Sequence, residues 1–461
     1  MEVKKEIRIL APCGILGYGY PKESFLRGME KRPDAIVVDA GSTDAGPHKL
    51  GAGVAIVSRK ACKKDLEIMI SEGAKAGIPV IIGSAGGSGG RVHVGWTWSI
   101  IQEILHEQGL EAMKTAIIWA DIPKETVKKR MAEGKVAPLG AAVPLLTEER
   151  LEETNAIVAQ MGHEPVVKAL KEGYQLIICG RAYDPSPFAA VAEYFGMPLA
   201  YGYHAGKILE CAALCAVPGT TKDCMLGTIT QEGFLVEPLS DSRKCTALSV
   251  AAHTFYEKNH PYVLHGPGTI LNLENCSFTE QGDGSVWVTG SRIEASDGYY
   301  IKLEGARKAA YRTFVVAGVR DPLFISRIKE IEGAAQNQTE AYYSEIPKED
   351  YRIHFMNYGI DAVMGELEPE PEDLPHEVGI VFEVLAKTQE IADSVCGTLR
   401  SSLLHYGYEG RKATAGNLAF PFAPSDISFG PVYEFSVYHL MEVADGLEMF
   451  PIEEVTLRAE G

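Results

Sequence analysis

The segment at 77–95, GIPVIIGSAGGSGGRVHVG, restricts the fold more than any other part of this chain. Its apolar run at 78–82 predicts a buried strand, which opens into a glycine-rich turn at 83–91. An apolar segment of helical length follows at 96–105. A strand, a glycine-rich turn and a helix in this order are typical of an open α/β sheet, where turn amides and the helix N-terminus bind negative charge. The sequence therefore predicts an anionic ligand at this turn.

The first half of the chain alternates short apolar runs with helical segments. Short strands that are apolar throughout are typical of a parallel sheet buried on both faces, with function at the carboxyl ends of the strands. We therefore predict an α/β domain over residues 1–225, with a doubly wound, mainly parallel, Rossmann-like sheet. The expected strands are 7–11, 35–39, 79–83, 115–120 and 175–179, and the expected helices are 22–31, 60–76, 96–109, 123–133 and 147–172.

The pattern changes after about residue 225. Short alternating runs at 285–294 and 298–319 predict strands, and Asp283-Gly284 is typical of a hairpin turn. A strand followed by a helix is expected within 378–405. A chain of 461 residues is too long for one ordinary domain. We therefore predict a second, smaller α+β domain over residues 226–461.

Composition restricts the partners and the compartment. The net charge of −18 argues against nonspecific binding to nucleic acid or to an anionic membrane surface. No apolar run approaches the roughly 20 residues of a membrane span, and the N-terminus lacks the apolar core of an export signal. Several of the nine cysteines lie in apolar runs, and the sequence has no CxxC motif, which favours reduced thiols. We expect a cytoplasmic protein that forms a homo-oligomer.

Polar side chains follow several of the expected strands. Asp39, Ser42 and Asp44 lie in the loop after the second strand, and Arg181 and Asp184 lie in the loop after the fifth. The carboxyl ends of parallel strands meet at one edge of a sheet, so these loops can converge. The carboxylates are candidates for proton transfer, and Ser42 is a candidate for binding the substrate. Turn-capping by Asp and Ser side chains is an alternative for Asp39 and Ser42.

Two basic side chains and the glycine-rich turn are the candidates for binding the anion. The turn lacks the lysine of a P-loop, so it does not predict a nucleoside triphosphate site. The guanidinium of Arg181 follows a buried strand directly, where it needs a partner, and a ligand anion or a structural Asp are equally good partners. The candidate substrate-binding residues of the turn are Ser84, Gly86, Gly87, Ser88, Gly89 and Arg91.

Three other interpretations stay open at this point. Gly14, Gly17 and Gly19 after the first strand, with Asp39 after the second, favour weakly an NAD(P)-dependent oxidoreductase, although their order is not GxGxxG. A divalent metal ion could use the aspartates, but no HxH or HExxH spacing supports one. Cys211 could be a nucleophile whose thiolate Lys207 favours, and a buried, inert thiol is the more common alternative.

Three runs resemble the acyclic terpene utilisation protein A (AtuA) family: ALKEGYQLIICGRAYDPSPFAAVAEYFG, HAGKILECAAL and YGYEGRKATAGNLAFPF. Family members carry a comparable GR-x-x-D-x-S turn, at residues 180–186 here, and a helix similar to H-x-LECGA, which 204–212 match in part. The resemblance is good over roughly 20–300 and looser beyond. It implies a role in degrading branched or unsaturated carboxylic acids, often as CoA thioesters. It also implies, for some members, a small separate partner protein, and it brings no known catalytic residues.

The residues and the resemblance together predict a lyase of the hydratase or dehydratase kind. It acts on a small carboxylic acid or its CoA thioester. Asp184, or Asp39 with Asp44, would move the proton beside the carbonyl group, and the turn and Arg181 would hold the anion. The alternatives are the NAD(P)-dependent oxidoreductase and a noncatalytic subunit whose site a small partner protein completes.

Overall fold

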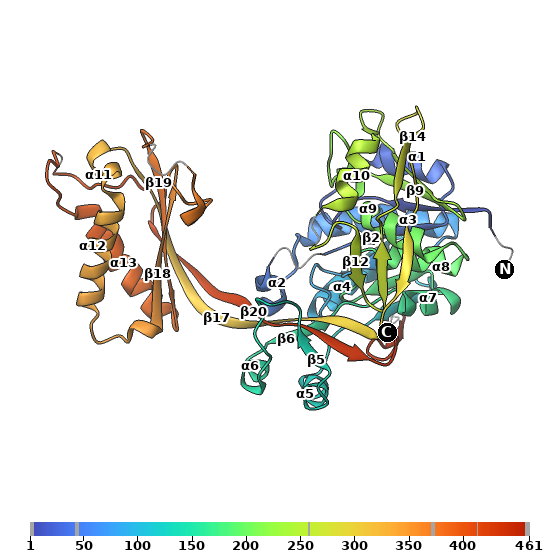
Figure 1. Cartoon of the computed structure of the whole chain (residues 1–461), viewed down its shortest axis with the longest axis horizontal. Helices are drawn as coiled ribbons and strands as arrows, with labels where there is room; N and C mark the ends of the chain where they lie inside the picture. The colour runs from blue at the N-terminus through green and yellow to red at the C-terminus, as the bar shows by residue number, and fades with distance from the viewer. Residues whose placement is uncertain (1–3, 42–45, 257–258, 370–373, 413, 457–461) are drawn as a thin grey trace. The chain divides into compact units, whose positions relative to one another are not determined.

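The computed structural model describes residues 4–41, 46–256, 259–369, 374–412 and 414–456. The chain forms two compact units: unit 1 comprises 1–307 and 435–461, and unit 2 comprises 308–434 (Figure 1). The predicted boundary at residue 225 falls inside unit 1, because the strand that begins there pairs with the first strand of the chain. None of the helices in the described ranges is long and apolar enough to cross a membrane.

Unit 1 is built on a large mixed sheet. Over the described residues its strands lie in the order β14 (Ser277–Glu280), β15 (Val286–Thr289), β10 (Phe234–Pro238), β9 (Met225–Thr230), β1 (Glu6–Ala11), β2 (Ala35–Asp39), β3 (Val80–Gly83), β7 (Leu176–Cys179), β4 (Thr115–Ile118) and β21 (Ile452–Val455). The strands from β1 to β4 in this order are the five predicted ones, and they are parallel. Every other pair is antiparallel, including the β14–β15 hairpin expected at Asp283-Gly284. The α/β class is confirmed, but the sheet is mixed rather than mainly parallel.

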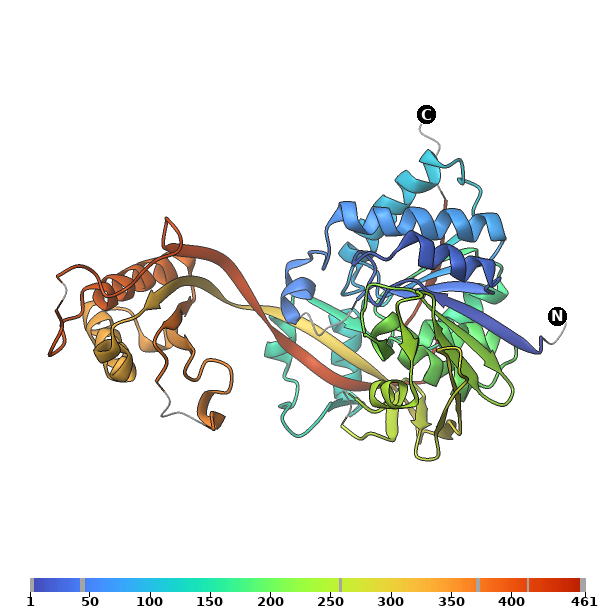
Figure 2. The same ribbon diagram turned by 90° about the horizontal axis from the view of Figure 1, so that it is seen from above.

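Helices cover both faces of this sheet. On one face, Val38, Ile82 and Ile178 pack with α1 (Lys22–Glu30), α3 (Arg59–Ala76) and α4 (Arg91–Glu107), the blue helices that lie together in Figure 2. On the other face, Val37 and Ile81 pack with α5 (Lys124–Ala132), α7 (Glu164–Lys171), α8 (Ser186–Tyr194) and α9 (Leu199–Leu209). Burial on both faces explains why these strands are apolar throughout.

The neighbouring strands β3 and β7 send the chain to opposite faces of the sheet. The chain leaves β3 towards α4 on one face and leaves β7 towards α8 on the other. The loops after these two strands therefore diverge at the carboxyl edge, which is where open α/β sheets form ligand-binding crevices. The sequence places the glycine-rich turn after β3 and Arg181 after β7.

The expected helix at 147–172 is wrong. The segment folds as α6 (Glu148–Glu152), β6 (Ala156–Ala159) and α7. The short apolar run of β6 pairs with Leu303–Ala306 of β17 (Tyr299–Val319), so tertiary pairing overrides the helical pattern around it. Unit 1 also contains α2 (Pro47–Ala52), α10 (Ala247–Phe255), the 3-10 helix η2 (Ala212–Cys215), and the strands β5 (Val136–Pro138), β8 (Ala216–Val217), β11 (Lys244–Cys245), β12 (Val263–Gly266), β13 (Thr269–Asn272) and β16 (Arg292–Ala295).

Unit 2 has an α+β fold, in which helices pack against an antiparallel sheet. The strand β19 (Val378–Ala386) pairs antiparallel with β18 (Tyr351–Tyr358) on one side and with Tyr311–Val319 of β17 on the other. The helices α12 (Ile328–Tyr342) and α13 (Gln389–His405) pack side by side against this sheet (Figure 1). Every second residue of β19 is buried, so one face of the sheet packs against the helices and forms the core of the unit. The unit also contains α11 (Pro322–Ser326), the 3-10 helices η3 (Lys348–Asp350) and η4 (Gly365–Leu367), and part of β20 (Asp426–Val443).

A buried acid joins α12 to β18 in unit 2. Glu332 is buried, and its Oε2 accepts a hydrogen bond of 3.2 Å from the side-chain amide of Asn357, which is also buried. Burial raises the pKa of Glu332 to about 7. Glu332 Oε1 and Asn357 Oδ1 have no partner among the described residues. Burial favours the uncharged form of a carboxyl group, so the acid form suits this site.

We expect the stability of unit 2 to fall as the pH rises from about 4.5 to about 7. The pKa is higher in the folded state than in the unfolded state, so the stabilisation is fully present below the unfolded value and is lost as the pH rises through the folded value. The loss should be about 3 kcal/mol. Hydrogen exchange of the β18 and α12 amides, corrected for the intrinsic rate at each pH, measures it.

The variant E332Q should show no such loss over this pH range. The matched control is E330Q, because Glu330 lies on the same helix, is exposed and pairs with Arg327. It should keep the pH dependence of the natural chain. An E332Q variant whose exchange still depends on pH as the natural chain's does would show that another group titrates.

Candidate active site

The loops after β1, β2, β3 and β7 meet at the carboxyl edge of the sheet. The amide of Leu16 donates to the Asp39 carbonyl over 3.1 Å, and that of Ala40 donates to the Gly83 carbonyl over 2.8 Å. A Cβ at Gly41 would overlap the backbone of Gly87, so only glycine allows these two loops to touch. A Cβ at Gly89 would likewise overlap the backbone of residue 181. The convergence expected from the sequence is therefore present.

The glycine-rich turn is buried, and several of its amides bond within the protein. Gly87 and Gly89 donate to the carbonyls of Ser84 and Ala85, and Arg91 donates to the Asp121 carboxylate over 2.9 Å. Gly86, Gly87 and Gly89 have positive φ angles, and so does Ser84, at 45°, which is uncommon for a side-chain residue. Ser84 and Ser88 are buried. These hydrogen bonds fix the conformation of the turn. They also occupy the amides of Gly87, Gly89 and Arg91, which are then not available to bind an anion.

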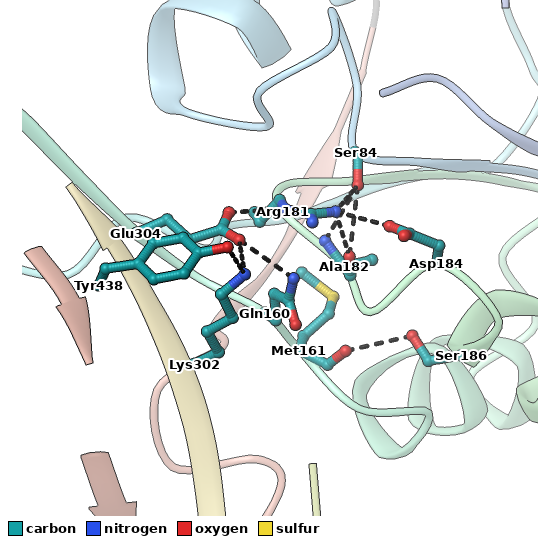
Figure 3. Close-up of polar contacts among 10 residues, drawn as sticks. All are labelled: Ser84, Gln160, Met161, Arg181, Ala182, Asp184, Ser186, Lys302, Glu304 and Tyr438. Atoms are coloured by element: carbon teal, nitrogen blue, oxygen red, sulfur yellow. Dashed lines mark hydrogen bonds and ion pairs between the residues drawn. The ribbon is translucent and has the colours of Figure 1, made fainter. Parts of the chain in front are cut away.

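Arg181 lies at the centre of a buried ionic network (Figure 3). Its side chain is 2% exposed. The Nη1 group donates to Asp184 over 2.7 Å and to the Ser84 hydroxyl over 3.1 Å, and Nε donates to Glu304 over 2.9 Å. The sequence left open whether a ligand anion or a carboxylate of the protein compensates Arg181. In the structure, two carboxylates of the protein do so. Arg181 therefore joins the turn, the β7 loop and β17.

Glu304 is a residue of this network that the sequence did not reveal. It is 0% exposed, and its Oε1 also pairs with Lys302 over 2.8 Å and accepts a hydrogen bond from Gln160 over 3.2 Å (Figure 3). Burial opposes ionisation, but the charges and hydrogen bonds of Arg181 and Lys302 outweigh it and lower the pKa of Glu304. An ionised Glu304 compensates the charge of Arg181. No local pattern identifies this pair, because 123 residues separate its members.

The carboxyl group of Asp39, at the carboxyl edge of the sheet, is strongly perturbed. It is 5% exposed, and its Oδ1 has no hydrogen-bond partner among the described residues. Burial and the nearby charge of Asp184 raise the pKa of Asp39, and the charge of Glu210 adds to the effect. The charge of Arg181 and a hydrogen bond from Gly41 oppose the shift without cancelling it. A carboxylate whose pKa is raised accepts a proton more readily than an ordinary aspartate does.

Asp184 lies in the loop after β7, at the same edge of the sheet, and its side chain is 27% exposed. Its charge helps to raise the pKa of Asp39. Ser42 and Asp44, the other candidates of the β2 loop, lie outside the described residues. The structure thus brings together Asp39, Asp184, Arg181 and Ser84, as the sequence predicted.

The last turn of α9 contributes further polar side chains. Lys207 is buried, and its Nζ lies 4.8 Å from the ring centroid of Tyr256. Glu210 follows one turn later. The Cys211 thiol lies 3.5 Å from the Tyr256 hydroxyl, and burial, together with the charge of Glu210, raises the pKa of Cys211 to about 12. This thiol is protonated at neutral pH and is a poor nucleophile.

The glycine loop after β1 is occupied by the protein itself. The amides of Gly17 and Gly19 donate to the Asp65 carboxylate over 2.8 and 3.0 Å. A dinucleotide pyrophosphate would need amides of this loop. Its geometry therefore gives NAD(P) binding no support. In the part of the chain that the structure describes, no group of three or more His, Cys, Asp or Glu side chains has the geometry to hold a metal ion.

Arg91 lines a cavity of about 620 Å³, and neither Arg181 nor Asp39 is among the residues that line this cavity. Its guanidinium stacks on the Trp119 ring at 4.0 Å. Asp121, which follows β4 at the same edge of the sheet, lines this cavity, and burial raises its pKa. The sequence offered a signal for Asp121, since this residue comes directly after the expected apolar strand 115–120, while Asp39 ends the strand 35–39. We place the candidate active site at Asp39, because the carboxylates and basic groups gather there.

A family model described as the acyclic terpene utilisation family protein AtuA matches residues 58–421. The match covers well over half of the chain and includes both the glycine-rich turn and the GR-x-x-D-x-S turn. It begins later than residue 20, where the good resemblance was expected to start, and it ends at 421, within the part where a looser resemblance was expected. No curated protein and no solved structure matches the chain.

Proposed function

The chain belongs to the acyclic terpene utilisation family AtuA, which is implicated in a catabolic role, and on this premise we propose that it is a lyase of the hydratase or dehydratase kind. Its substrate is a small branched or unsaturated carboxylic acid or the CoA thioester of one. It adds water across the Cα–Cβ double bond next to the carbonyl group, or eliminates water to form that double bond. Such a reaction needs a base for the proton on the α-carbon and a group that stabilises the enolate.

The buried carboxyl group of Asp39, with its raised pKa, is the observation that carries this proposal. Its carboxyl group is buried at the ligand-binding edge of the sheet, its pKa is raised, and one oxygen lacks a partner among the described residues. In a purely structural role, such a carboxyl group would be unfavourable without compensation. As a base, it gains from the raised pKa, because a carboxylate with a higher pKa takes a proton from carbon with a larger driving force.

The neighbouring candidates support Asp39 in this scheme. Arg181 holds Asp184 in place through the 2.7 Å ion pair, and Asp184 in turn raises the pKa of Asp39. The turn residues Ser84, Gly86, Gly87, Ser88 and Gly89 shape one wall of the site. Asp44 and Ser42 stay candidates for proton transfer and substrate binding in the β2 loop. Arg91 stays a candidate for contacting a remote part of the substrate.

Mass spectrometry of the purified protein with a panel of β-hydroxyacyl-CoA and enoyl-CoA thioesters, and with the matching free acids, tests this function. We expect at least one member of the panel to gain or lose one molecule of water. A substrate that changes only when NAD(P) is added would favour the oxidoreductase instead. Binding without turnover, followed by turnover after a small partner protein is added, would favour the noncatalytic subunit.

A further inference from the structure

The cavity of about 620 Å³ that Arg91 lines lies after β4, at the carboxyl edge of the sheet. We call it the β4 cavity. Its walls come from four parts of unit 1: the end of α2, the first turn of α4, the segment that joins β4 to α5, and the segment that leads into β6. The apolar lining residues are Leu50, Val92, Ile122, Pro123, Ala156 and Ile157. A cavity of this size and lining is typical of a site for a small organic ligand or for part of a larger one.

Two side chains of the β4 cavity carry hydrogen-bond acceptors without a partner. His93 is 2% exposed, and its Nε2 donates to the Lys49 carbonyl over 3.0 Å. Burial lowers the pKa of His93, so the ring is neutral and its Nδ1 is an acceptor. Asp121 Oδ1 accepts from the Arg91 amide over 2.9 Å. His93 Nδ1 and Asp121 Oδ2 have no partner among the described residues, so a ligand that brings hydrogen-bond donors would compensate them.

The β4 cavity also has groups that attract negative charge. The Arg91 guanidinium stacks on the Trp119 ring at 4.0 Å, and an aromatic face holds a cation without neutralising its charge. The helix α5 begins in the wall, and among the described residues no side chain caps it. The N–H groups of its first turn are therefore left for water or for an anion. Lys124 is already paired with Glu152, so Arg91 and these amides are the groups for an anion.

A ligand that fits all these groups carries N–H donors in one part and negative charge in another. An adenine nucleotide has both properties. The exocyclic amino group of adenine carries two N–H donors, its ring is flat and largely apolar, and its phosphates are anionic. An ionised carboxylic acid has no such donor. An aliphatic amine has donors, but the positive charge of Arg91 would repel its ammonium group.

The glycine-rich turn connects the β4 cavity with Asp39. Gly41 lies two residues after Asp39, and a Cβ on Gly41 would overlap the backbone of Gly87. Gly90, in the same turn, lines the β4 cavity. Gly87 and Gly90 are three residues apart, so at most about 11 Å separates their Cα atoms. The pantetheine arm of CoA is long enough to span this distance, so one thioester can reach both places.

We propose that the β4 cavity binds the adenine nucleotide of a CoA thioester. The amino group of adenine lies at Asp121 and His93, and a phosphate lies at Arg91 and the first turn of α5. This assignment rests on the proposed function and deepens it, because it selects the thioester over the free acid. The thioester end then extends along the glycine-rich turn towards Asp39.

Titration calorimetry with CoA, ADP, IDP and NAD⁺ tests this assignment. IDP differs from ADP in the purine ring, where an oxygen replaces the amino group. We expect the natural chain to bind CoA more tightly than NAD⁺, and ADP at least about tenfold more tightly than IDP, because IDP brings an acceptor to the two acceptors of the cavity. The variant R91M should weaken the binding of CoA and ADP by on the order of tenfold. The variant D121N should lose most of the preference for ADP, since its amide can donate to the oxygen of IDP.

The matched control is R59M, because Arg59 begins α3 as Arg91 begins α4, pairs with Glu103 and does not line the cavity. It should bind every nucleotide as the natural chain does. Equal binding of ADP and IDP by the natural chain, unchanged binding by a folded R91M, or tighter binding of NAD⁺ than of CoA would overturn the assignment. If D121N does not fold, the comparison of ADP with IDP on the natural chain decides the matter.

The failure of this assignment can be told apart from the failure of the proposed function. Turnover of a CoA thioester that neither ADP nor CoA inhibits would overturn the nucleotide site and leave the lyase standing. The expected preferences for CoA and ADP, without gain or loss of water by any thioester, would support the nucleotide site and contradict the lyase.

Discussion

Asp39→Asn is expected to lower the turnover of a thioester substrate by about a hundredfold or more, which is the scale of a lost general base. The melting temperature should stay the same or rise. Asn has nearly the same shape and can still accept the hydrogen bond from Gly41, but it removes a buried acid whose Oδ1 has no partner among the described residues. Turnover measured beside thermal unfolding separates the two effects.

Asp65→Asn is the matched control for this experiment. Asp65 is also a buried aspartate, but its Oδ2 accepts hydrogen bonds from two backbone amides. Its loss should lower the melting temperature and leave the turnover of folded protein nearly unchanged. If D39N lowers the melting temperature as D65N does and keeps full turnover, Asp39 has a structural role, and Asp184 and Asp44 become the candidates.

Arg181→Met is expected to lower the free energy of unfolding by about 3–5 kcal/mol, the usual effect of removing one partner of a buried ion pair. Glu304 is 0% exposed and would lose its ion pair with Arg181 while keeping the one with Lys302. Arg181→Lys should destabilise less, because it keeps the charge but cannot reach Glu304, Asp184 and Ser84 at once. Unfolding by denaturant measures all of these variants.

The double variant R181M/E304Q should recover part of the lost stability, because it removes the carboxylate that R181M leaves without a guanidinium. The exposed pair of Lys168 and Glu172 provides a control, and K168M should change the stability by only about 0.5 kcal/mol. A stability of R181M within about 1 kcal/mol of the natural chain would contradict the structural role of the network. A ligand anion would then be the better explanation for this buried guanidinium.

The sequence predicted the carboxyl edge well because the information there is local. Each parallel strand is a short apolar run, and the residues after it are glycines and polar groups, as at Asp39 and Arg181. The sequence also showed that a guanidinium in this position needs an anion. Asp184 is a candidate for that anion, because it lies three residues after Arg181 in the sequence.

The rest depends on contacts that no local pattern records. Glu304 reaches Arg181 only because β17 returns to pair with β6, and β6 itself was hidden inside an apparent helix. The antiparallel strands on both sides of the parallel set come from the distant segments 225–289 and 452–455. Lys207 and Glu210 were visible as a pair on one helix face, but the burial of Lys207 follows from how α9 packs on the sheet.

The measurement that tests the central claim most directly is deuterium incorporation at the α-carbon of a β-hydroxyacyl-CoA thioester in D₂O. The natural chain and D39N are incubated with the same panel of straight and branched thioesters, and mass spectrometry follows the label. The account predicts rapid incorporation at the α-carbon by the natural chain for at least one thioester, and incorporation by D39N no faster than in buffer. Equal incorporation by both proteins, or none by the natural chain, would contradict proton removal by Asp39.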